Sequence, residues 1–446
     1  MVTSWYCRKL IKFTVFKRQV EFTVTLEFTF SIQQTLIVGI DIGSETHFAR
    51  AFDWRNYEYT KKPFEFSNNK EGFQSFESWM EELSAKHGKT AVIPGMEPTG
   101  HYWFALGKFL QDNGMRPVHV NPHHVKKSKE LDDNNPNKND RKDPKTIAGL
   151  VNEGRFSYPY IPIGVYAEIR NLSNLRFQAQ EELTRAKNRL ARWFSIYFPE
   201  YKDVYRDIKA VSGRMVLQMA PLPEDIRKLG VEGVNRIWRD AKLRGAGMKR
   251  AKTLVTAAEH SVGSKESPEA ARIELKILLH DIDEYASRVE ELLSLLDAKL
   301  SEIPYIDKLL GIKGIGKITV SGFIAEVGDI RRFDDPKQLQ KLAGYAIVAN
   351  ESGKYKGESR ISYRGRKRLR YVLFEAALSL VARNPEFRKI YEYYRTRENN
   401  PLKKIQSLVA VACKVIRVFY VMLTKGVDYD PEKMMRDIRR PELQTA

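Results

Sequence analysis

The sequence predicts an α/β N-terminal domain, then a helical or coiled-coil region, then a mostly α C-terminal domain. Three observations favour this order. Strand-like and helix-like apolar patterns alternate from residue 35 to 120, and helical spacing is continuous from about 165 to 302. A glycine-rich turn between two short helical segments follows. The predicted boundaries are an N-terminal extension at 1–34, the α/β domain at 35–156, the helical region at 157–304, the C-terminal domain at 305–425 and a tail at 426–446.

The α/β domain is predicted to contain a mixed sheet. Two apolar runs, 35–42 and 46–53, flank Gly43-Ser44-Glu45, which is typical of a hairpin turn. A polar, turn-rich stretch at 129–139 predicts a mobile loop ahead of another helix. The remaining predicted elements are a helix capped by Asn69 that passes through Phe73 and Leu83, a strand at 90–96, a helix at about 102–112 and a strand at 117–120.

The helical region contains one unusually regular apolar seam. From Leu275 to Ile303, apolar residues recur in alternating steps of four and three, the spacing of a coiled coil. The seam can pack within one chain as a helical hairpin or pair between chains. We expect a homo-oligomer, dimer or tetramer, that is at least dimeric through this seam.

Composition favours a polyanionic partner. The formal net charge is +19 and the isoelectric point about 9.6, which favours nucleic acid over a membrane. The two cysteines, Cys7 and Cys413, have no metal-ligand spacing, and this fits the cytoplasm. Lys414 and Arg417 interrupt the apolar segment 405–423, so we expect a buried or amphipathic helix and no membrane partner. Basic residues also interrupt the first 34 residues, which excludes a signal peptide there, and we expect this extension to be dispensable.

Four acidic residues are the candidate catalytic and metal-binding group. Asp41 lies in an apolar strand, and Glu97 closes a second apolar run. Asp140 and Asp143 are three apart at the start of a helical pattern, so their carboxylates share one helix face. Carboxylates from two strand ends and a helix, in a basic protein, predict Mg²⁺ ions that act on nucleic-acid phosphates.

Each acid also has a simpler interpretation. Glu97 could cap the next helix, and the pair Asp140 and Asp143 could be favoured by a helix dipole. Asp41 also fits the phosphate loop of sugar kinases and actin-like ATPases, but a second Asp-x-Gly loop and a glycine-rich adenosine site are missing from the sequence. One shared metal site explains all four acids together. The histidines without zinc spacing are interpreted as surface or packing residues: His101, His119, His123 and His124.

Two segments of the C-terminal domain are candidates for nucleic-acid binding. Gly314-Ile315-Gly316 resembles the turn of a helix-hairpin-helix, although a simple packing turn is nearly as good an interpretation. Residues 353–370 are dominated by basic residues with interleaved tyrosines and glycines, which is typical of a phosphate-binding loop. The candidate residues are Lys313, Gly314, Gly316, Lys317, Lys354, Lys356, Arg360, Arg364, Arg366, Lys367, Arg368 and Arg370.

These motifs together resemble one family over residues 35–425. The family is the insertion-sequence transposases, bridge-RNA-guided recombinases that join a RuvC-like (ribonuclease-H-like) DEDD domain to a serine-bearing C-terminal transposase domain. The sequence departs from the family pattern in its N-terminal extension and in Ala346-Ile347-Val348. The matching stretches are 38–43, Glu97-Pro98-Thr99-Gly100, Asn121-Pro122, 139–143, Gly314-Ile315-Gly316, Leu342-Ala343-Gly344-Tyr345, Ser352-Gly353 and 361–365.

The resemblance implies a recombinase that cuts and rejoins double-stranded DNA at element ends and target, guided by a structured RNA. Asp41, Glu97, Asp140 and Asp143 would hold Mg²⁺, and Ser352 would be the nucleophile. Ser359 and Ser362 are the alternative nucleophiles. Two other functions stay open: a Holliday-junction-type endonuclease without a covalent serine step, and a DNA- or RNA-binding module with degenerate acids.

Overall fold

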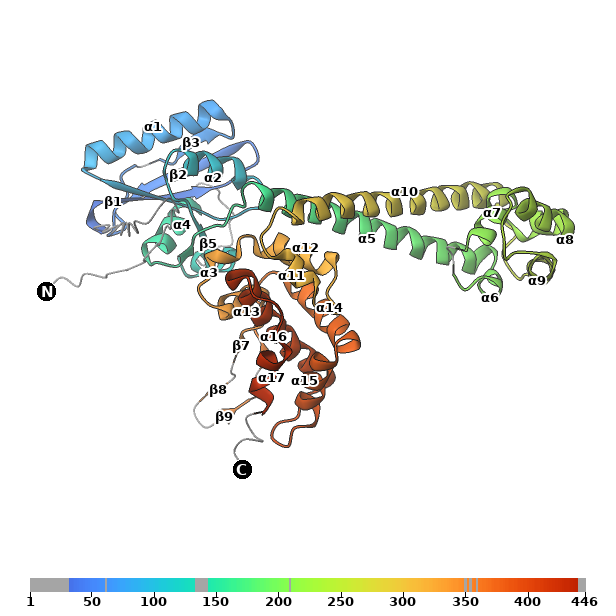
Figure 1. Cartoon of the computed structure of the whole chain (residues 1–446). Helices are drawn as coiled ribbons and strands as arrows, with labels where there is room; N and C mark the ends of the chain where they lie inside the picture. The colour runs from blue at the N-terminus through green and yellow to red at the C-terminus, as the bar shows by residue number, and fades with distance from the viewer. Residues whose placement is uncertain are drawn as a thin grey trace. The chain divides into compact units, whose positions relative to one another are not determined.

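The computed structural model describes residues 32–60, 62–132, 143–207, 210–348, 351–352, 355–357 and 360–439. The chain divides between Ile161 and Pro162 into two compact units (Figure 1). The first is a mixed α/β domain with a central sheet, as predicted, and the second is mostly helical. The predicted domain boundaries remain an interpretation within these units.

The N-terminal unit is built on a sheet in the order β3-β2-β1-β4-β5-β6. The β1–β4 and β4–β5 pairs are parallel and the other pairs antiparallel, which confirms the mixed sheet and the β1–β2 hairpin. The strands are β1 Thr35–Asp41, β2 Thr46–Phe52, β3 Phe64–Ser67, β4 Ala91–Met96, β5 Val118–Val120 and β6 Phe156–Ser157.

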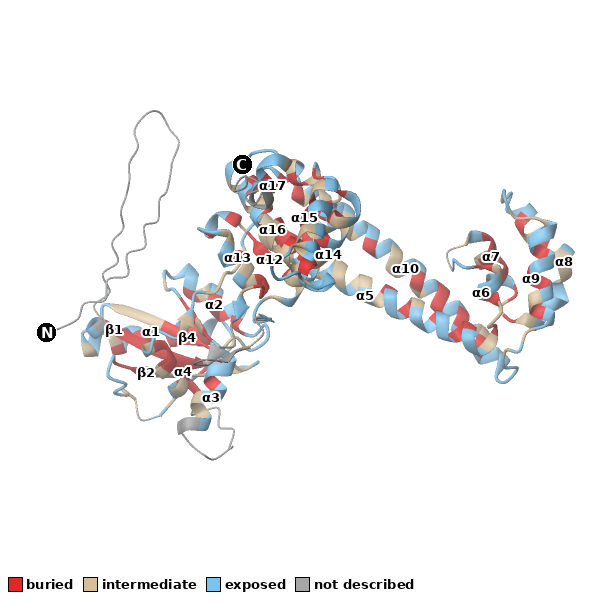
Figure 2. Cartoon of the chain, turned by 90° about the horizontal axis from the view of Figure 1, so that it is seen from below, coloured by how far each residue is buried: buried red, intermediate tan, exposed pale blue. Residues whose placement is uncertain are grey.

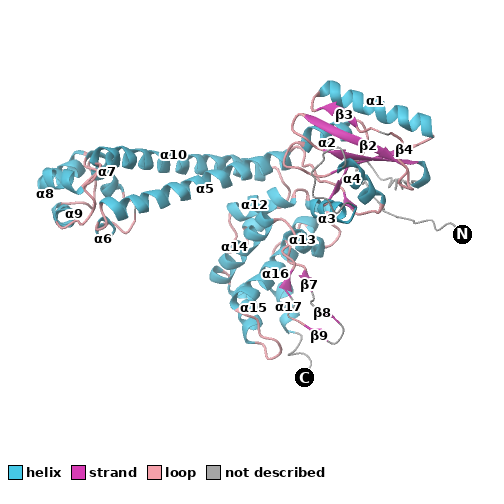
Figure 3. Cartoon of the chain, turned by 180° about the vertical axis from the view of Figure 1, so that it is seen from behind, coloured by secondary structure: helices cyan, strands magenta, loops and turns pink. Residues whose placement is uncertain are grey.

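Helices cover both faces of this sheet (Figure 3). Alternate residues of β1 point to opposite faces. Leu36, Val38 and Ile40 pack with α1 (Lys70–His87) and α2 (Trp103–Asp112). Ile37 packs on the other face with α3 (Pro122–Asp132) and α4 (Asp143–Asn152). Asn69 caps α1 as predicted, since its Oδ1 accepts the Gly72 N–H at 2.8 Å.

The structure differs from two predictions, one about the loop at 129–139 and one about the N-terminal extension at 1–34. The loop predicted at 129–139 begins later, because Lys129–Asp132 form the last turn of α3. Residues 133–142, which include Asp140, lie outside the described residues. Of the N-terminal extension, η1 (Ile32–Gln34) is described. Lys89 Nζ donates to the Gln33 carbonyl and Thr90 N–H to the Gln34 carbonyl, so these two residues belong to the folded unit.

The second unit contains a long helical hairpin, α5 (Val165–Tyr197) beside α10 (Pro268–Leu300) (Figures 1 and 2). Buried residues recur along both helices at regular intervals (Figure 2). Leu275, Leu279 and Ile282 of the seam pack with α5 residues, and Leu296 and Leu300 pack with Ile169. The helices that follow α5 before the chain returns are α6 Tyr201–Val204, α7 Val211–Met219, α8 Pro223–Asp240 and α9 Met248–Glu259.

The heptad spacing correctly indicated a packed helix face, and within the chain this face is covered by α5. The intrachain hairpin, one of the two alternatives, therefore accounts for these positions. Pairing between chains stays a prediction.

The remainder of the second unit packs around α16. Val411, Val415 and Phe419 of this helix are buried in a core shared with α12 and α14. Among the described residues α16 is the one helix long and apolar enough to cross a membrane, yet half of its apolar window is buried inside the protein, as expected for a core helix. The elements are α11 Ile306–Leu310, α12 Lys317–Val327, η2 Ile330–Arg332, α13 Pro336–Ala343, β7 Ile347–Val348, β8 Glu351–Ser352, β9 Tyr355–Lys356, β10 Arg360–Ile361, α14 Lys367–Arg383, α15 Pro385–Thr396, α16 Lys404–Lys425 and α17 Pro431–Arg439.

Candidate active site and nucleic-acid interface

Asp41 and Glu97 lie side by side at the ends of neighbouring parallel strands. Ile40 is the Cα partner of Met96 in the β1–β4 pair, so the acids that follow them, Asp41 at the end of β1 and Glu97 just after β4, lie at the same level. Neighbouring strands are about 4.8 Å apart. Because Ile40 and Met96 point into the α1 and α2 core, the alternation sends both acids toward the opposite face, which α4 covers. The strand register therefore brings together two residues that are far apart in the sequence.

Two glycines let α4 pack directly on these strands. A Cβ atom at Gly39 would lie 1.9 Å from the Pro144 carbonyl oxygen, and one at Gly95 would lie 2.4 Å from Val151 Cγ2. Gly39 precedes Asp41 by two residues on the same face of β1. Asp143, the first residue of α4 and the neighbour of Pro144, is thus held over the strand that carries Asp41. The strand register and this contact place three of the four predicted acids at the same end of β1 and β4.

Asp143 is buried and forms an ion pair with Lys129 of α3. Within the described ranges, no group of three His, Cys, Asp or Glu side chains is arranged to hold a metal ion. The fourth predicted ligand, Asp140, lies outside those ranges. Carboxylate oxygens are the donors that Mg²⁺ prefers, so the residue types fit this ion. An ion bound by Asp143 would replace Lys129 as the partner of the carboxylate.

His47 is a buried residue beside this site that the sequence analysis missed. Its Nδ1 accepts the Gly43 N–H at 3.2 Å, which fixes the turn two residues after Asp41. Its ring lies on the opposite face of the sheet, between Phe66 and Phe73. Burial lowers the pKa of His47 below its usual value, so the ring is neutral. The signal in the sequence was its alternation with Ala49 and Ala51 on β2.

The other histidines behave as predicted. His119 packs edge-on against Trp103, with ring centroids 4.2 Å apart, and burial lowers its pKa to about 4. His101, His123 and His124 are exposed.

Ser352 ends β8 in a short hairpin. Its Cα partner is Tyr355 of β9, and Lys354 lies outside the described residues. The neighbouring strands β7 and β10 form a second short pair. Ser362, an alternative nucleophile, donates from its Oγ to the Gly344 carbonyl at 3.4 Å. The Ser362 hydroxyl is therefore engaged in a hydrogen bond to the backbone. Ser359, the other alternative, lies outside the described residues.

Two of the stretches that carry the family resemblance, 342–345 and 361–365, pack on each other beside this hairpin. A Cβ at Gly365 would lie 2.5 Å from the Gly344 nitrogen and from the Leu342 carbonyl oxygen. Arg366 N–H donates to the Leu342 carbonyl at 2.7 Å. Gly344 has φ 75°, a conformation that favours glycine. Residues 342–345 and 362–365 thus close the base of the segment that carries Ser352.

The structure has a helix on each side of the predicted glycine turn, which fits both a helix-hairpin-helix and a packing turn. Helices α11 and α12 flank the turn, and Gly314 has φ 101°. Ser379 Oγ donates to the Gly314 carbonyl at 2.7 Å, so this side of the turn packs on α14. Lys313 and Lys317 are exposed, although Lys317 pairs with Asp297 at 2.6 Å.

The basic residues after the hairpin fall into two groups. Arg360, Arg364 and Lys367 are exposed. Arg366 and Arg370 instead donate to carbonyls of their own chain: Arg366 Nη1 to Glu326 at 2.7 Å, and Arg370 Nη1 to Ala343 at 3.0 Å and Tyr363 at 3.2 Å. These two arginines have a structural role that composition alone did not reveal.

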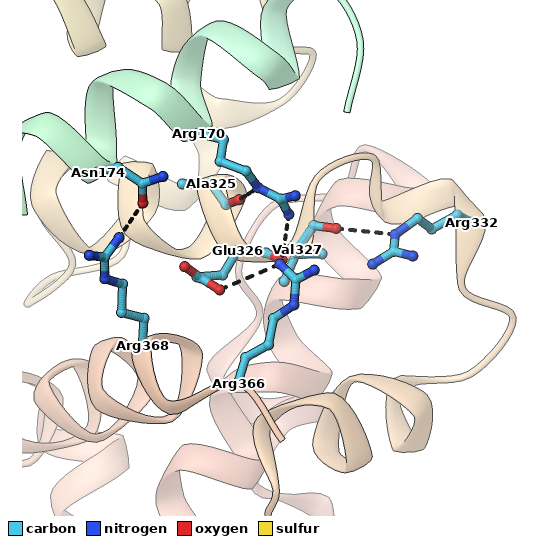
Figure 4. Close-up of polar contacts among 8 residues, drawn as sticks. All are labelled: Arg170, Asn174, Ala325, Glu326, Val327, Arg332, Arg366 and Arg368. Atoms are coloured by element: carbon cyan, nitrogen blue, oxygen red, sulfur yellow. Dashed lines mark hydrogen bonds and ion pairs between the residues drawn. The ribbon is translucent and has the colours of Figure 1, made fainter. Parts of the chain in front are cut away.

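Arg366 belongs to a cluster of arginines at the C-terminal end of α12 (Figure 4). Arg170 of α5 donates to the Ala325 carbonyl at 2.9 Å and the Glu326 carbonyl at 3.3 Å, and Arg332 donates to the Val327 carbonyl at 3.2 Å. The last carbonyls of a helix lack intrahelical partners and carry negative partial charge. The arginines supply both the hydrogen bonds and the opposite charge.

Comparison with known proteins gives matches to both halves of the chain. A family model described as a transposase of the DEDD type from IS110 matches residues 38–199, and one described as the transposase IS116/IS110/IS902 family matches residues 306–392. The first spans the acids with α5, and the second spans the helix-hairpin-helix, Ser352 and the basic segment.

Three relatives illustrate the range of similarity. The chain is 25% identical to an insertion element IS116 protein of Streptomyces clavuligerus, over 64% of this chain and 71% of the relative. It is 24% identical to an insertion element IS900 protein of Mycobacterium paratuberculosis, over 65% and 73%. It is 30% identical to a pilin gene-inverting protein of Moraxella lacunata, over 29% and 40%.

Proposed function

Because the chain belongs to the IS110/IS116/IS900 family of transposases, we propose that it cuts and rejoins DNA to mobilise an insertion sequence, with Mg²⁺ held by four acids and Ser352 as nucleophile. The observation that carries the proposal is the β1–β4 register, which aligns Asp41 with Glu97. The packing of α4 at Gly39 supports it, since this contact holds Asp143 over the same strand. A ribonuclease-H-like (RuvC-like) classification of the unit is part of this proposal.

The N-terminal unit would hold Mg²⁺ through Asp41, Glu97, Asp140 and Asp143. When bound, the ion would supply charge stabilisation for a phosphodiester under attack. The protein's own contribution is positioning: the sheet fixes Asp41 and Glu97, and Gly39 and Gly95 fix the start of α4. Lys129, the present partner of Asp143, would hold this carboxylate in place before an ion binds.

The C-terminal unit would supply the covalent step. The Ser352 hydroxyl would attack a backbone phosphorus, forming a phosphoserine bond and breaking one P–O bond of the strand. The serine loses a proton and the released strand end gains one. A hydroxyl of another strand end would then attack the phosphoserine and regenerate Ser352, so the rejoining step needs no ATP. Arg360 and Arg364, both exposed beside this hairpin, would neutralise neighbouring phosphates.

The experiment is a denaturing gel of labelled element-end DNA with the wild-type protein and the variants Ser352→Ala and Ser362→Ala. We expect a protein–DNA adduct with wild type and with Ser362→Ala, and none with Ser352→Ala. An adduct that survives in Ser352→Ala but is lost in Ser362→Ala would move the nucleophile to Ser362.

The second candidate function is a metal-dependent Holliday-junction-type endonuclease. The observation that favours it is that the three described acids converge within the N-terminal unit, without any residue of the second. Mg²⁺-dependent cleavage without any adduct in the wild type would establish this function in place of the first.

We also propose a structured guide RNA as a partner. The support is the net charge of +19, which exceeds what one short DNA contact needs. RNA that copurifies with the protein and protects defined sequences from nuclease would support this partner. Preparations with identical absorbance ratios before and after nuclease treatment would exclude it. Whether the protein is a dimer or tetramer can be read by light scattering with and without RNA and DNA.

A further inference from the structure

Arg176 of α5 is a half-buried cation of the second unit. It follows Arg170 by six residues, and its Nε atom is buried with no hydrogen-bond acceptor in the described part of the chain. Burial lowers the pKa of the Arg176 guanidinium, and the positive charge of Arg368 lowers it further, whereas Tyr371 acts in the opposite direction. A desolvated charge beside a like charge destabilises the fold unless something pairs with it.

Arg368 approaches Arg176 from the first turn of α14. Its guanidinium lies over the Phe177 ring, 4.4 Å from the centroid, and Nη1 donates to Asn174 Oδ1 on α5 (Figure 4). The Tyr371 ring meets Phe177 edge-on, with centroids 6.4 Å apart, and 54% of Tyr371 is exposed. Phe177 and Asn174 thus hold Arg368 in one orientation at the solvent boundary.

This pair differs from the arginines at the end of α12. Arg170 and Arg366 donate to carbonyls, and Arg366 also lies 3.5 Å from a Glu326 carboxylate oxygen. Among the described residues, neither Arg176 nor Arg368 forms an ion pair with a carboxylate. Arg368 is also at the positive N-terminal end of α14, whose cap, Arg366, makes no side-chain cap hydrogen bond. Two guanidiniums at this helix end favour an anion as their partner.

We propose that Arg176 and Arg368, with Phe177 and Tyr371 beside them, form a binding site for a backbone phosphate of nucleic acid. A phosphate accepts hydrogen bonds from both guanidiniums and neutralises their repulsion. The exposed face of Tyr371 lies where an adjoining sugar or base can rest. The site rests on the proposed action on nucleic acid, but it is separate from the four acids and from Ser352.

The first test measures binding as a function of salt for matched double-stranded DNA, single-stranded DNA and RNA. Arg176→Gln and Arg368→Gln should each lower the slope of log affinity against log salt by about 0.9 for duplex DNA, or about 0.7 for a single strand. Arg189→Gln, which removes an exposed arginine from the same helix, is the control and should leave the slope unchanged. The nucleic acid whose slope changes is the one that the site binds. Slopes equal to those of the control in all three cases would overturn the proposal.

The second test separates a binding role from a packing role. Arg176→Gln should unfold at the same or a higher temperature than wild type, because it removes a half-buried cation whose Nε has no acceptor. Inorganic phosphate should raise the unfolding temperature of wild type more than that of Arg176→Gln. A lower unfolding temperature for Arg176→Gln, together with no phosphate effect on wild type, would assign Arg176 to packing. Both tests read binding and stability, so the site stands or fails independently of any adduct at Ser352.

Discussion

The two units use the ends of helices in opposite ways. In the N-terminal unit, the first residue of α4 is an acid, Asp143, held over a strand that ends in Asp41. In the second unit, three arginines converge on the last carbonyls of α12 (Figure 4). Both arrangements match the helix dipole. They differ in what the charged groups contact. The arginines donate hydrogen bonds to backbone carbonyls, whereas the acids lie at the ends of two central strands.

This difference indicates which charged side chains contribute to stability and which are expected to contribute to activity. A side chain that caps buried carbonyls stabilises the protein, and its loss leaves those carbonyls unsatisfied. A carboxylate beside other carboxylates repels them and requires a cation. Replacing the acids should therefore affect activity more than stability, and replacing the arginines should do the reverse.

The largest expected effect comes from the acids. Asp41→Asn and Glu97→Gln should each reduce Mg²⁺-dependent strand cleavage on the order of 100-fold or more, because each weakens the ion's site. The free energy of unfolding should change less than cleavage does, because neither residue belongs to a hydrophobic core. Cleavage of labelled DNA and thermal unfolding check both statements, with Glu81→Gln, an exposed acid on α1, as the control. Wild-type cleavage by both variants would remove these acids from the site.

The next largest effect concerns the contact between β1 and the start of α4. Gly39→Ala should destabilise the N-terminal unit by about 1–3 kcal/mol, because the new methyl group collides with the Pro144 carbonyl. Cleavage should fall with it as Asp143 moves away from Asp41. Gly149→Ala is a matched control on α4, because a Cβ there has no atom within 4 Å. Denaturant unfolding should show this control to be slightly more stable than wild type, by about 0.5–1 kcal/mol. Equal stability of Gly39→Ala and Gly149→Ala would contradict the close contact.

A smaller effect is expected at the end of α12. Arg170→Gln should lower the free energy of unfolding of the second unit by about 1–2 kcal/mol, because the Ala325 and Glu326 carbonyls lose their donor. Arg331→Gln should change it by less than about 0.5 kcal/mol, since this exposed arginine pairs only locally with Asp329. Hydrogen exchange of the α12 amides locates the change. Faster exchange in Arg331→Gln than in Arg170→Gln would reverse the assignment.

The smallest effect is a pH dependence of the N-terminal unit. The folded pKa of His119 is about 4, below the usual 6.5 of the unfolded chain, so the unfolded state binds the extra proton. Stability should fall as the pH falls from about 6.5 toward 4 and then level off. The partial burial of His119 keeps this loss modest. His119→Leu should flatten the dependence, which hydrogen exchange of the β5 amides at pH 7 and pH 5 can measure. An unchanged slope in His119→Leu would assign the dependence to His47, whose pKa is also lowered.

The sequence by itself determined the elements whose pattern is local. The period-two alternation of β1 and β2, the Asn69 cap and the glycines of the helix-hairpin-helix turn each depend on neighbours a few residues away. The same locality explains why the short strands β3 and β6 were missed. Their patterns are too brief to stand out from loops. Helix α3 was missed because most of its residues are polar.

Tertiary structure alone decided the partners. Heptad spacing identified a buried face on α10 but could not say that α5 covers it, because the same spacing serves hairpins and dimers. Composition marked Arg366 and Arg370 as basic, but only the fold placed carbonyls within reach of their guanidiniums. The sequence also offered four acids at separate positions, and the β1–β4 register with the contact at Gly39 brought three of them together. Periodicity specifies which side of an element is buried, whereas the choice of partner depends on contacts between residues distant in the chain.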